Sequence, residues 1–377
     1  MLFSDDAPTY DPYKALYVHL PFCVRRCGYC DFATEAVPAD DARIDAYVED
    51  LALQVRRKAK EGELAAVETV YIGGGTPSHV GMPRLSMLLY TLSLSMRLEP
   101  DVECAMEANP ESLTGNMVRD IWALGVNRLS IGVQSLDDAV LRTLGRAHSA
   151  DDARRAVAAA RERFDNVSVD LMCGIPGQSA ESFEATVREA VALGASHVSV
   201  YPLTIEPHTP FHRAVMRGQM PEPDDDVEAA HMEIAARVLA EAGFSRYEVA
   251  SYALPGQECR HNIAYWTGAP YLGLGRSAAT MTQNDKRRMR VQDGRVTDDL
   301  DARQMAAEDL MLGMRMTRGV SEAQVERAAA LLPEAPAALA RLEAQGLVAH
   351  EGGRFRPTER GWLCGNELYG ALFDLAP

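Results

Sequence analysis

The clearest chemical signal in the sequence is a cluster of three cysteines near its start. Cys23, Cys27 and Cys30 form a C-x3-C-x2-C pattern, so three thiols lie within eight residues. An iron–sulfur cluster usually takes four thiolates. Three thiolates would leave one iron open, and an open iron can bind a reactant. The spacing therefore predicts a metal centre suited to chemistry as well as to structure.

A structural zinc ion is the alternative metal centre for these thiols. Such an ion needs four ligands, commonly from two paired C-x2-C units. No fourth ligand lies close by, because His19 belongs to the preceding predicted strand and the next cysteine is Cys104. Chance proximity of three unrelated cysteines is the remaining alternative. Free cysteines usually pack as small core residues, and we interpret Cys104, Cys173 and Cys364 in that way.

The elements that must position the thiols alternate along the chain. Short apolar runs rich in β-branched and aromatic residues predict six buried strands, at residues 15–20, 69–72, 102–107, 128–133, 167–172 and 197–203. Amphipathic stretches between them predict helices, including residues 41–60, 83–96 and 150–163. Alternating strands and helices imply right-handed βαβ units around a parallel sheet. The predicted fold class is α/β, as an incomplete (β/α) barrel or an open sheet.

Polar residues and glycines stand at the carboxyl ends of these predicted strands, where α/β barrels build their active sites. Gly73-Gly74-Gly75-Thr76 ends the second strand, and glycines allow a ligand to approach the backbone closely. Glu107 ends the third strand, where its carboxylate can accept hydrogen bonds from hydroxyl or ammonium groups. The later strands and the turns after them add Gln134, Arg146 and Asp170.

Together these motifs closely resemble the radical S-adenosylmethionine (SAM) superfamily, and within it the coproporphyrinogen III dehydrogenase-like family. The resemblance spans about residues 15–375. It implies a partial (β/α)6 TIM-like barrel and a small, mainly helical, winged-helix-like C-terminal domain. It also implies a [4Fe-4S] cluster on Cys23, Cys27 and Cys30, beside Tyr29, with SAM on the open iron. The SAM contacts that the resemblance implies are Tyr17, Gly74, Gly75, Thr76, Glu107, Gln134, Arg146 and Asp170.

Two features separate the branches of this family. The dehydrogenases carry an additional cysteine two positions after the third motif cysteine, whereas here that position is Phe32. The string His261-Asn-Ile-Ala-Tyr-Trp266, or H-N-x-x-Y-W, resembles the signature of the HemW-type heme chaperones. Histidine is a good axial ligand for heme iron, so His261 is a candidate heme ligand and Cys259 a second one. The alternative is that His261 caps a turn and that the aromatic residues belong to the core.

The resemblance implies a heme chaperone, which binds heme and transfers it to recipient proteins. An electron donor is implied too, and the sequence does not identify it. The alternative is an oxygen-independent coproporphyrinogen III oxidase or dehydrogenase, which uses SAM for oxidative decarboxylation in porphyrin biosynthesis. Phe32 and the short segment before Cys23 argue against that activity. Whether the chain cleaves SAM stays open.

The composition restricts the partners and the compartment. The 38 basic and 54 acidic residues give a formal net charge of −16, which does not suit nucleic acid or anionic lipid. No apolar run approaches the roughly 18 residues of a membrane span. The N-terminus lacks the basic start of a secretory signal. We therefore expect a cytoplasmic protein with reduced thiols.

The sequence predicts four successive segments. A tail occupies residues 1–14 and the radical SAM core occupies residues 15–240. A connecting region with the H-N-x-x-Y-W string covers residues 241–303, and a C-terminal helical domain covers residues 304–377. In that last segment helical runs precede a Gly-Gly turn, which predicts helices followed by a β-hairpin.

Overall fold

The computed structural model describes residues 10–96 and 101–377, and its main element is one twelve-stranded sheet. Residues 1–9, most of the predicted tail, lie outside the described residues. Six neighbouring strands run parallel and confirm the six predicted from the sequence: β1 (Ala15–Leu20), β4 (Thr69–Gly74), β5 (Glu103–Ala108), β6 (Arg128–Gln134), β7 (Asn166–Cys173) and β8 (His197–Pro202). The carboxyl ends of these strands therefore meet at one edge of the sheet.

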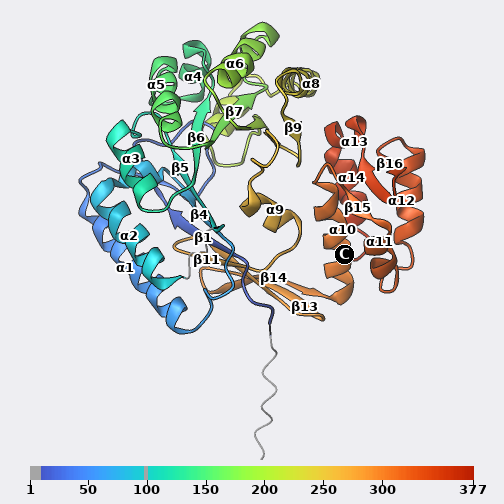
Figure 1. Ribbon diagram of the computed structural model, residues 1–377. Coiled ribbons are helices and arrows are strands. Elements are labelled where there is room, and N and C mark those ends of the chain that lie inside the picture. Colours follow the sequence, from blue (N-terminus) through green and yellow to red (C-terminus); the bar gives the residue numbers. More distant parts are fainter. Residues whose placement is uncertain (1–9, 97–100) are drawn as a thin grey trace, which may run out of the picture.

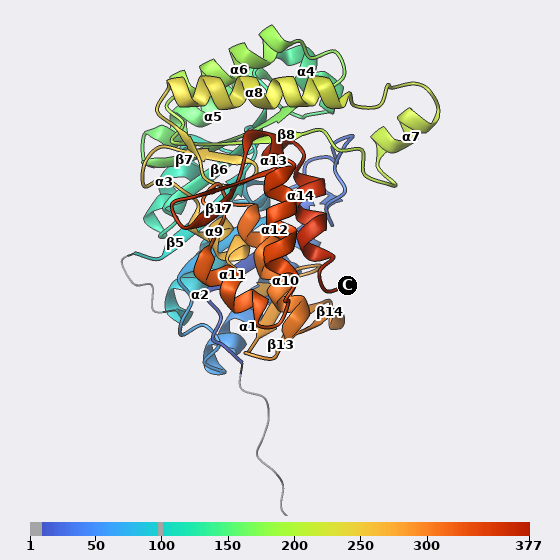
Figure 2. The same cartoon turned by 90° about the vertical axis from the view of Figure 1, so that its right-hand side faces the viewer.

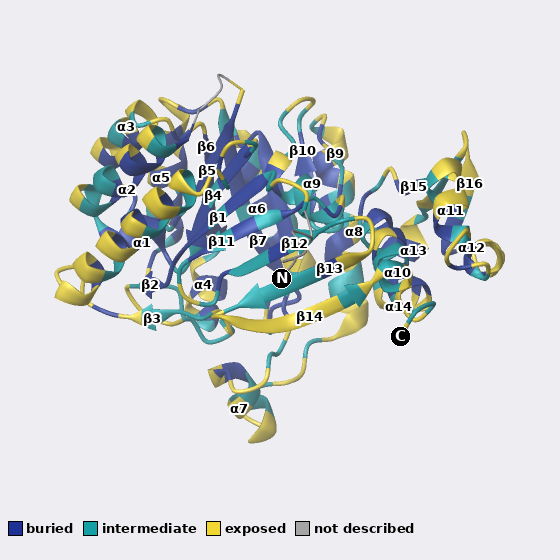
Figure 3. Ribbon diagram, turned by 90° about the horizontal axis from the view of Figure 1, so that it is seen from below, coloured by how far each residue is buried: buried dark blue, intermediate teal, exposed yellow. Residues whose placement is uncertain are grey.

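Helices cover the outer face of the curved sheet (Figure 1). They are α1 (Ala42–Lys60), α2 (Met82–Ser95), α3 (Gly115–Ala123), α4 (Asp138–Leu144), α5 (Ala150–Arg161), α6 (Ala180–Ala192) and α8 (Asp225–Glu241), and a short 3-10 helix at Pro77–Val80 precedes α2. The spacing of apolar residues predicts one buried face for α1, and Ile44, Val48, Leu51 and Val55 on it are inaccessible to solvent. Tyr47, the fifth residue of that predicted face, is half-buried. Figure 3 shows the result, buried strands inside and exposed outer helix faces.

The segment at residues 241–303 is part of the sheet and does more than connect two domains. The strands β9 (Ser245–Arg246) and β10 (Ser251–Ala253) extend the sheet beyond β8. On the other side β11 (Tyr271–Leu274) pairs parallel with β1, and the antiparallel strands β12 (Ala279–Gln283), β13 (Arg287–Gln292) and β14 (Arg295–Asp301) follow. Periodicity could not show this, because pairing between distant segments is a tertiary property.

The helix α9 (Arg260–Trp266) carries the H-N-x-x-Y-W string and lies across the amino ends of β4, β5 and β6. The buried Glu103 carboxylate accepts hydrogen bonds from the backbone N–H groups of Arg260 and His261. It also pairs with buried Arg128, at 3.1 Å from the guanidinium Nε. A buried ion pair tolerates desolvation only when further hydrogen bonds satisfy it. These contacts fix α9 against the sheet end opposite the cysteines.

The C-terminal unit has a hydrophobic core of its own and stands beside the sheet (Figures 1 and 2). Its helices are α10 (Ala302–Met314), α11 (Glu322–Ala329), α12 (Ala335–Ala344), α13 (Glu359–Leu363) and α14 (Gly365–Phe373). The predicted hairpin is present as β16 (Val348–Glu351) and β17 (Arg354–Pro357), with β15 (Val320–Ser321) added on β17. None of the described helices is long and apolar enough to cross a membrane.

Candidate functional site

The three motif thiols line one cavity of about 440 Å³ at the carboxyl ends of the parallel strands. The strand β2 (Phe22–Cys23) follows β1 and pairs with β3 (Glu35–Ala36), so the loop that carries Cys27 and Cys30 is tied down at both ends. The structure therefore brings the cysteines to the edge that the (β/α) pattern predicted. The other predicted residues on the wall of this cavity are Tyr29, Gly74, Gly75, Glu107, Gln134, Arg146 and Asp170.

Two of the predicted residues lie outside this cavity. Thr76 is buried behind Cys23, and its hydroxyl donates to the Cys23 thiol at 3.4 Å. Tyr17 lines a neighbouring cavity of about 530 Å³, which shares Gly74 and Glu107 with the first. Thr76 therefore touches the thiol, and Tyr17 approaches the same region from the β1 side.

A chain of hydrogen bonds connects two of the thiols. Arg146 Nη1 donates to the Cys27 thiol at 3.4 Å, and Arg146 Nη2 donates to Asn109 Oδ1 at 2.8 Å. The Asn109 amide then donates to Thr76 Oγ1 at 2.9 Å, and Thr76 donates to Cys23. The two terminal donors, Arg146 Nη1 and Thr76 Oγ1, donate to sulfur, and such hydrogen bonds stabilise negative charge on a thiolate.

The electrostatics of the cavity disfavour free thiolates. Burial raises the pKa of the Cys23 thiol to about 11, although the hydrogen bond from Thr76 lowers it. Burial also raises the pKa of the Cys30 thiol. A metal centre supplies the positive charge that deprotonates such ligands. The thiols are thus suited to a site that a cation completes.

The spacing of the thiols bears on the kind of metal centre. Within residues 10–96 and 101–377, no three His, Cys, Asp or Glu side chains come close enough to hold one metal ion. A tetrahedral zinc site would need four ligands around one point. A cubane cluster instead takes one thiolate at each of several separate iron corners. Three thiols are one ligand short of a structural zinc site, whereas a cluster can leave one iron without a thiolate.

Two carboxyl groups face the same cavity from β5 and β7, the strands on either side of β6. Glu107 accepts from the Gly74 N–H at 3.0 Å and from the Tyr71 hydroxyl at 2.9 Å, and Asp170 accepts from the Ser130 hydroxyl at 2.9 Å. Burial, reinforced by the charge of Asp170, raises the pKa of Glu107 to about 7. Burial raises the pKa of Asp170 to about 6. Both groups can therefore change charge near neutral pH. A ligand in the cavity could donate hydrogen bonds to them from hydroxyl or ammonium groups.

The glycine run after β4 makes room for protein as well as for a ligand. A Cβ on Gly73 would lie 2.9 Å from the Glu107 carboxyl group, and a Cβ on Gly74 would lie 2.5 Å from the His19 ring. A Cβ on Gly75 would approach the backbone of Pro21 and Phe22 to 2.7–2.9 Å. The run therefore lets the strand end pack against the segment that leads into the cysteine loop, so the absence of side chains serves packing as well as ligand access.

Sequence reasoning did not single out three residues of the site. Asn109 joins the Thr76 and Arg146 ends of the hydrogen-bond chain, Ser130 holds Asp170, and Tyr71 holds Glu107. Asn109 lies two residues after the predicted Glu107, and Ser130 lies four residues before the predicted Gln134. Tyr71 could have been predicted, because residues two apart in a strand face the same side and Tyr71 lies two positions before Gly73.

The structure does not place the expected heme ligands at an open site. His261 is 1% exposed, and its two ring nitrogens are hydrogen-bonded to Thr69 Oγ1 at 2.9 Å and to the Tyr265 hydroxyl at 3.1 Å. Cys259 is buried, and its thiol lies 3.6 Å from a Glu103 oxygen. An axial ligand needs a free nitrogen or sulfur aimed at the iron. Both ring nitrogens of His261 are engaged in this conformation, and heme ligation by these residues stays a prediction.

The remaining cysteines follow the prediction in two of three cases. Cys104 and Cys173 are buried in the main core, as expected. Cys364 is half-buried at the junction of α13 and α14 and packs against the core of the C-terminal unit. Phe32 is 64% exposed at the mouth of both cavities. None of these residues adds a ligand to the three-thiol site.

Comparisons with known proteins agree with this geometry. Residues 17–190 match the Radical SAM superfamily, and residues 300–364 match the HemN C-terminal domain. The chain is 37% identical to the heme chaperone HemW of Mycobacterium tuberculosis (strain ATCC 25618 / H37Rv), over 95% of this chain and 94% of that protein. It is 33% identical to the heme chaperone HemW of Bacillus subtilis (strain 168), over 95% of this chain and 99% of that one.

Among solved structures, the coproporphyrinogen III oxidase HemN from Escherichia coli has the same fold. The TM-score is 0.78, with 22% sequence identity over 97% of this chain and 90% of that chain. The fold, the cysteine loop and the superfamily match define a radical SAM protein. Within that superfamily, the chain belongs to the HemW family.

Replacing Thr76 by valine should shift the reduction potential of the reconstituted cluster. The variant keeps the shape of the side chain but removes the hydrogen bond to Cys23. That hydrogen bond stabilises negative charge on the sulfur and so favours the reduced cluster. A hydrogen bond worth about 1 kcal/mol corresponds to a shift of about 40 mV to more negative values for one electron. The measurement is a potentiometric titration followed by electron paramagnetic resonance. Thr91→Val, at a buried threonine of α2 bonded to the Met87 carbonyl, is the matched control and should leave the potential unchanged.

Replacing Glu107 by glutamine should change how stability depends on pH. The carboxyl group ionises near pH 4.5 in the unfolded chain but near pH 7 in the folded chain, so the folded wild type loses stability as pH rises between these values. The variant lacks this loss. Between pH 5 and pH 8 it should gain about 2 kcal/mol in the free energy of unfolding relative to wild type. If chemical denaturation gives the same pH dependence of the free energy of unfolding for variant and wild type, Glu107 is not a buried ionisable group.

Proposed function

We propose that this protein is a heme chaperone, which binds heme and transfers it to recipient proteins. The observation that carries the proposal is the 37% identity to a protein named heme chaperone HemW, across almost the full length of both chains. Phe32 supports it, because the dehydrogenase branch that the sequence resembles has a cysteine at that position.

The cavity at the strand ends is proposed to hold a [4Fe-4S] cluster on Cys23, Cys27 and Cys30, with SAM beside it. When bound, the cluster would supply one electron and an iron that is free to bind SAM. The residues proposed around the cluster and SAM are Tyr17, Tyr29, Gly74, Gly75, Thr76, Glu107, Gln134, Arg146 and Asp170. Among them Arg146 and Thr76 donate hydrogen bonds to thiols. Glu107 and Asp170 offer acceptors for hydroxyl or ammonium groups.

The strained backbone of Gln134 supports this proposal. Its φ angle is 65°, in the left-handed region that non-glycine residues rarely adopt. Such conformations persist where the surrounding structure enforces them, and they gather at ligand sites. Here the conformation ends β6 at the wall of the cavity. It supports Gln134 as a residue that binds ligand, as the resemblance implied.

We also propose that His261 holds α9 in place. Its ring is stacked on Tyr71 with 5.1 Å between centroids, and Tyr71 in turn donates to Glu107. Burial lowers the pKa of His261 to about 3, so the ring stays neutral at physiological pH. The H-N-x-x-Y-W string therefore connects the amino ends of the strands, through Tyr71, to Glu107 in the cavity proposed to hold SAM.

The functional test is a comparison of heme binding with porphyrinogen turnover on one anaerobic preparation of the full chain. Heme binding is followed by the Soret absorption band, and turnover by mass spectrometry of the products. We expect a stable heme complex and no loss of carboxyl groups from coproporphyrinogen III. Loss of two carboxyl groups without a heme complex would replace the chaperone proposal by the dehydrogenase.

His261→Ala should lower the free energy of unfolding by about 2–3 kcal/mol, because it leaves the Thr69 and Tyr265 hydroxyls unpaired and opens a cavity. The folded variant should still bind hemin with an affinity near that of wild type. Chemical denaturation and Soret titration are the two measurements. His350→Ala, at an exposed histidine of β16, is the control for both. A stable variant that has lost its Soret band would show instead that His261 ligates the iron.

A further inference from the structure

A third cavity lies between α9 and the C-terminal unit. Its volume is about 620 Å³, and Trp266 and Thr267 at the end of α9 face α10 and α11 across it. The described residues that line it include none of those that line the cysteine cavity. Its size falls within the roughly 300–1,000 Å³ of pockets that hold organic ligands. It is therefore a separate candidate site.

The walls of this cavity are the facing sides of two helices. The lining residues of α10 are Ala302, Met305, Ala306, Asp309, Leu310 and Gly313, and those of α11 with the turn after it are Gln324, Arg327, Ala328 and Leu331. The spacing of three and four residues places each set on one side of its helix. Small and apolar side chains dominate the α10 wall, which leaves room for a flat apolar body.

The charges at this cavity favour an anion, although the whole chain carries −16. Arg318, Arg327 and Arg354 all line it. Within the described ranges, Arg318 and Arg327 have no ion-pair partner, while Arg354 donates to the carbonyls of Arg318 and Gly319. Asp309 is paired with Arg288 at 2.7 Å, which offsets its charge.

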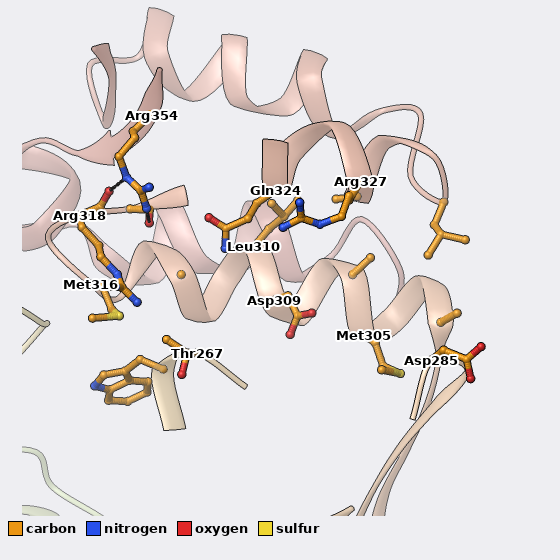
Figure 4. A pocket seen from close by; sticks show the side chains of 17 residues that line it. Thr267, Asp285, Met305, Asp309, Leu310, Met316, Arg318, Gln324, Arg327 and Arg354 are labelled. Atoms are coloured by element: carbon orange, nitrogen blue, oxygen red, sulfur yellow. Dashed lines mark hydrogen bonds between the residues drawn. The ribbon is translucent and has the colours of Figure 1, made fainter. Parts of the chain in front are cut away.

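The positions of the three arginines match a ligand that carries negative charge at its edge. Figure 4 shows Arg318 and Arg354 at one end of the cavity, Arg327 along its side, and Asp285 at the far end. Arginine is well suited to carboxylates because its planar fork can pair with both oxygens. Two unpaired guanidinium groups, together with the small and apolar side chains of the α10 wall, therefore fit a planar molecule that carries carboxylates.

No imidazole, thiol or phenol group belongs to the described lining of this cavity. Met305 and Met316 supply its sulfur atoms, and a thioether is a weak acceptor in the side-chain inventory. A ligand here would be held mainly by packing and by its carboxylates. Weak coordination is an advantage for a cargo that must later leave for another protein.

Trp266 gives the cavity a fixed aromatic wall. The Arg315 guanidinium lies 5.2 Å from the centre of the Trp266 ring and 4.6 Å from that of Tyr369 on α14, so it bridges the two aromatic rings. Tyr265, which directly precedes Trp266 in α9, lines the cavity of about 530 Å³ that contains Gly74 and Glu107. The string in α9 thus borders the proposed SAM region on one side and this third cavity on the other.

We propose that this cavity is the cargo site, which binds a tetrapyrrole through its apolar plane and pairs Arg318 and Arg327 with the propionate groups. The proposal rests on the heme chaperone function and assigns a place to its cargo. It differs from the sequence expectation in using Trp266 as a wall and no histidine as a ligand.

The test is a hemin titration of the full-length chain, with the double variant Arg318→Glu/Arg327→Glu compared with wild type. We expect the variant to bind hemin at least about tenfold more weakly, because charge-assisted pairing with the propionates becomes repulsion. The matched control, Arg341→Glu/Arg356→Glu, makes the same change of charge at exposed arginines of the same unit and should retain wild-type affinity. Ala306→Trp fills the slot from α10 and should weaken binding without any change of charge.

Two iron-free probes separate this site from a coordinating one. Protoporphyrin IX should bind wild type within about fivefold of hemin, and its dimethyl ester should bind much more weakly, because packing and carboxylates hold the ligand. If wild type binds no hemin, the heme chaperone function itself fails. If wild type binds hemin and both double variants and Ala306→Trp bind it equally well, the function stands and this site is wrong. Each variant must show the unfolding midpoint of a folded chain.

Discussion

The chain of hydrogen bonds from Arg146 through Asn109 to Thr76 is the interaction on which the site depends. It starts at a guanidinium group and ends at two thiols, and it ties the segments after β4, β5 and α4 to the cysteine loop. A loop of three cysteines alone would be free to take many shapes. Anchored in this way, its thiols converge on one cavity at the strand ends, where cofactor chemistry is most easily supported.

The opposite end of the barrel has its own constraint. The Glu103 carboxylate binds Arg128 and the first N–H groups of α9, so the helix is held across the strand ends. From there His261 packs on Tyr71, and Tyr71 bonds Glu107 beside Gly74. Residues at the two ends of β4 are therefore in contact through side chains. This arrangement explains why one short string can border both the cofactor region and the cavity at the C-terminal unit.

Local patterns were enough to predict the six parallel strands, the buried face of α1 and the C-terminal hairpin. The cysteine spacing likewise predicted three thiols at one strand end. Sequence reasoning failed where the outcome depends on tertiary packing. It could not show that residues 241–303 extend the sheet, that the glycine run makes room for His19, or that Asn109 links two predicted residues. Nor could it show the burial of His261, because a histidine pattern does not reveal what its ring nitrogens contact.

The most direct measurement of the central claim is electron paramagnetic resonance of the dithionite-reduced, reconstituted chain, with and without SAM. Three thiolates that leave one iron open predict a cubane signal that changes when SAM is added. A sample with no cubane signal, or with a signal that SAM leaves unaltered, would contradict the account.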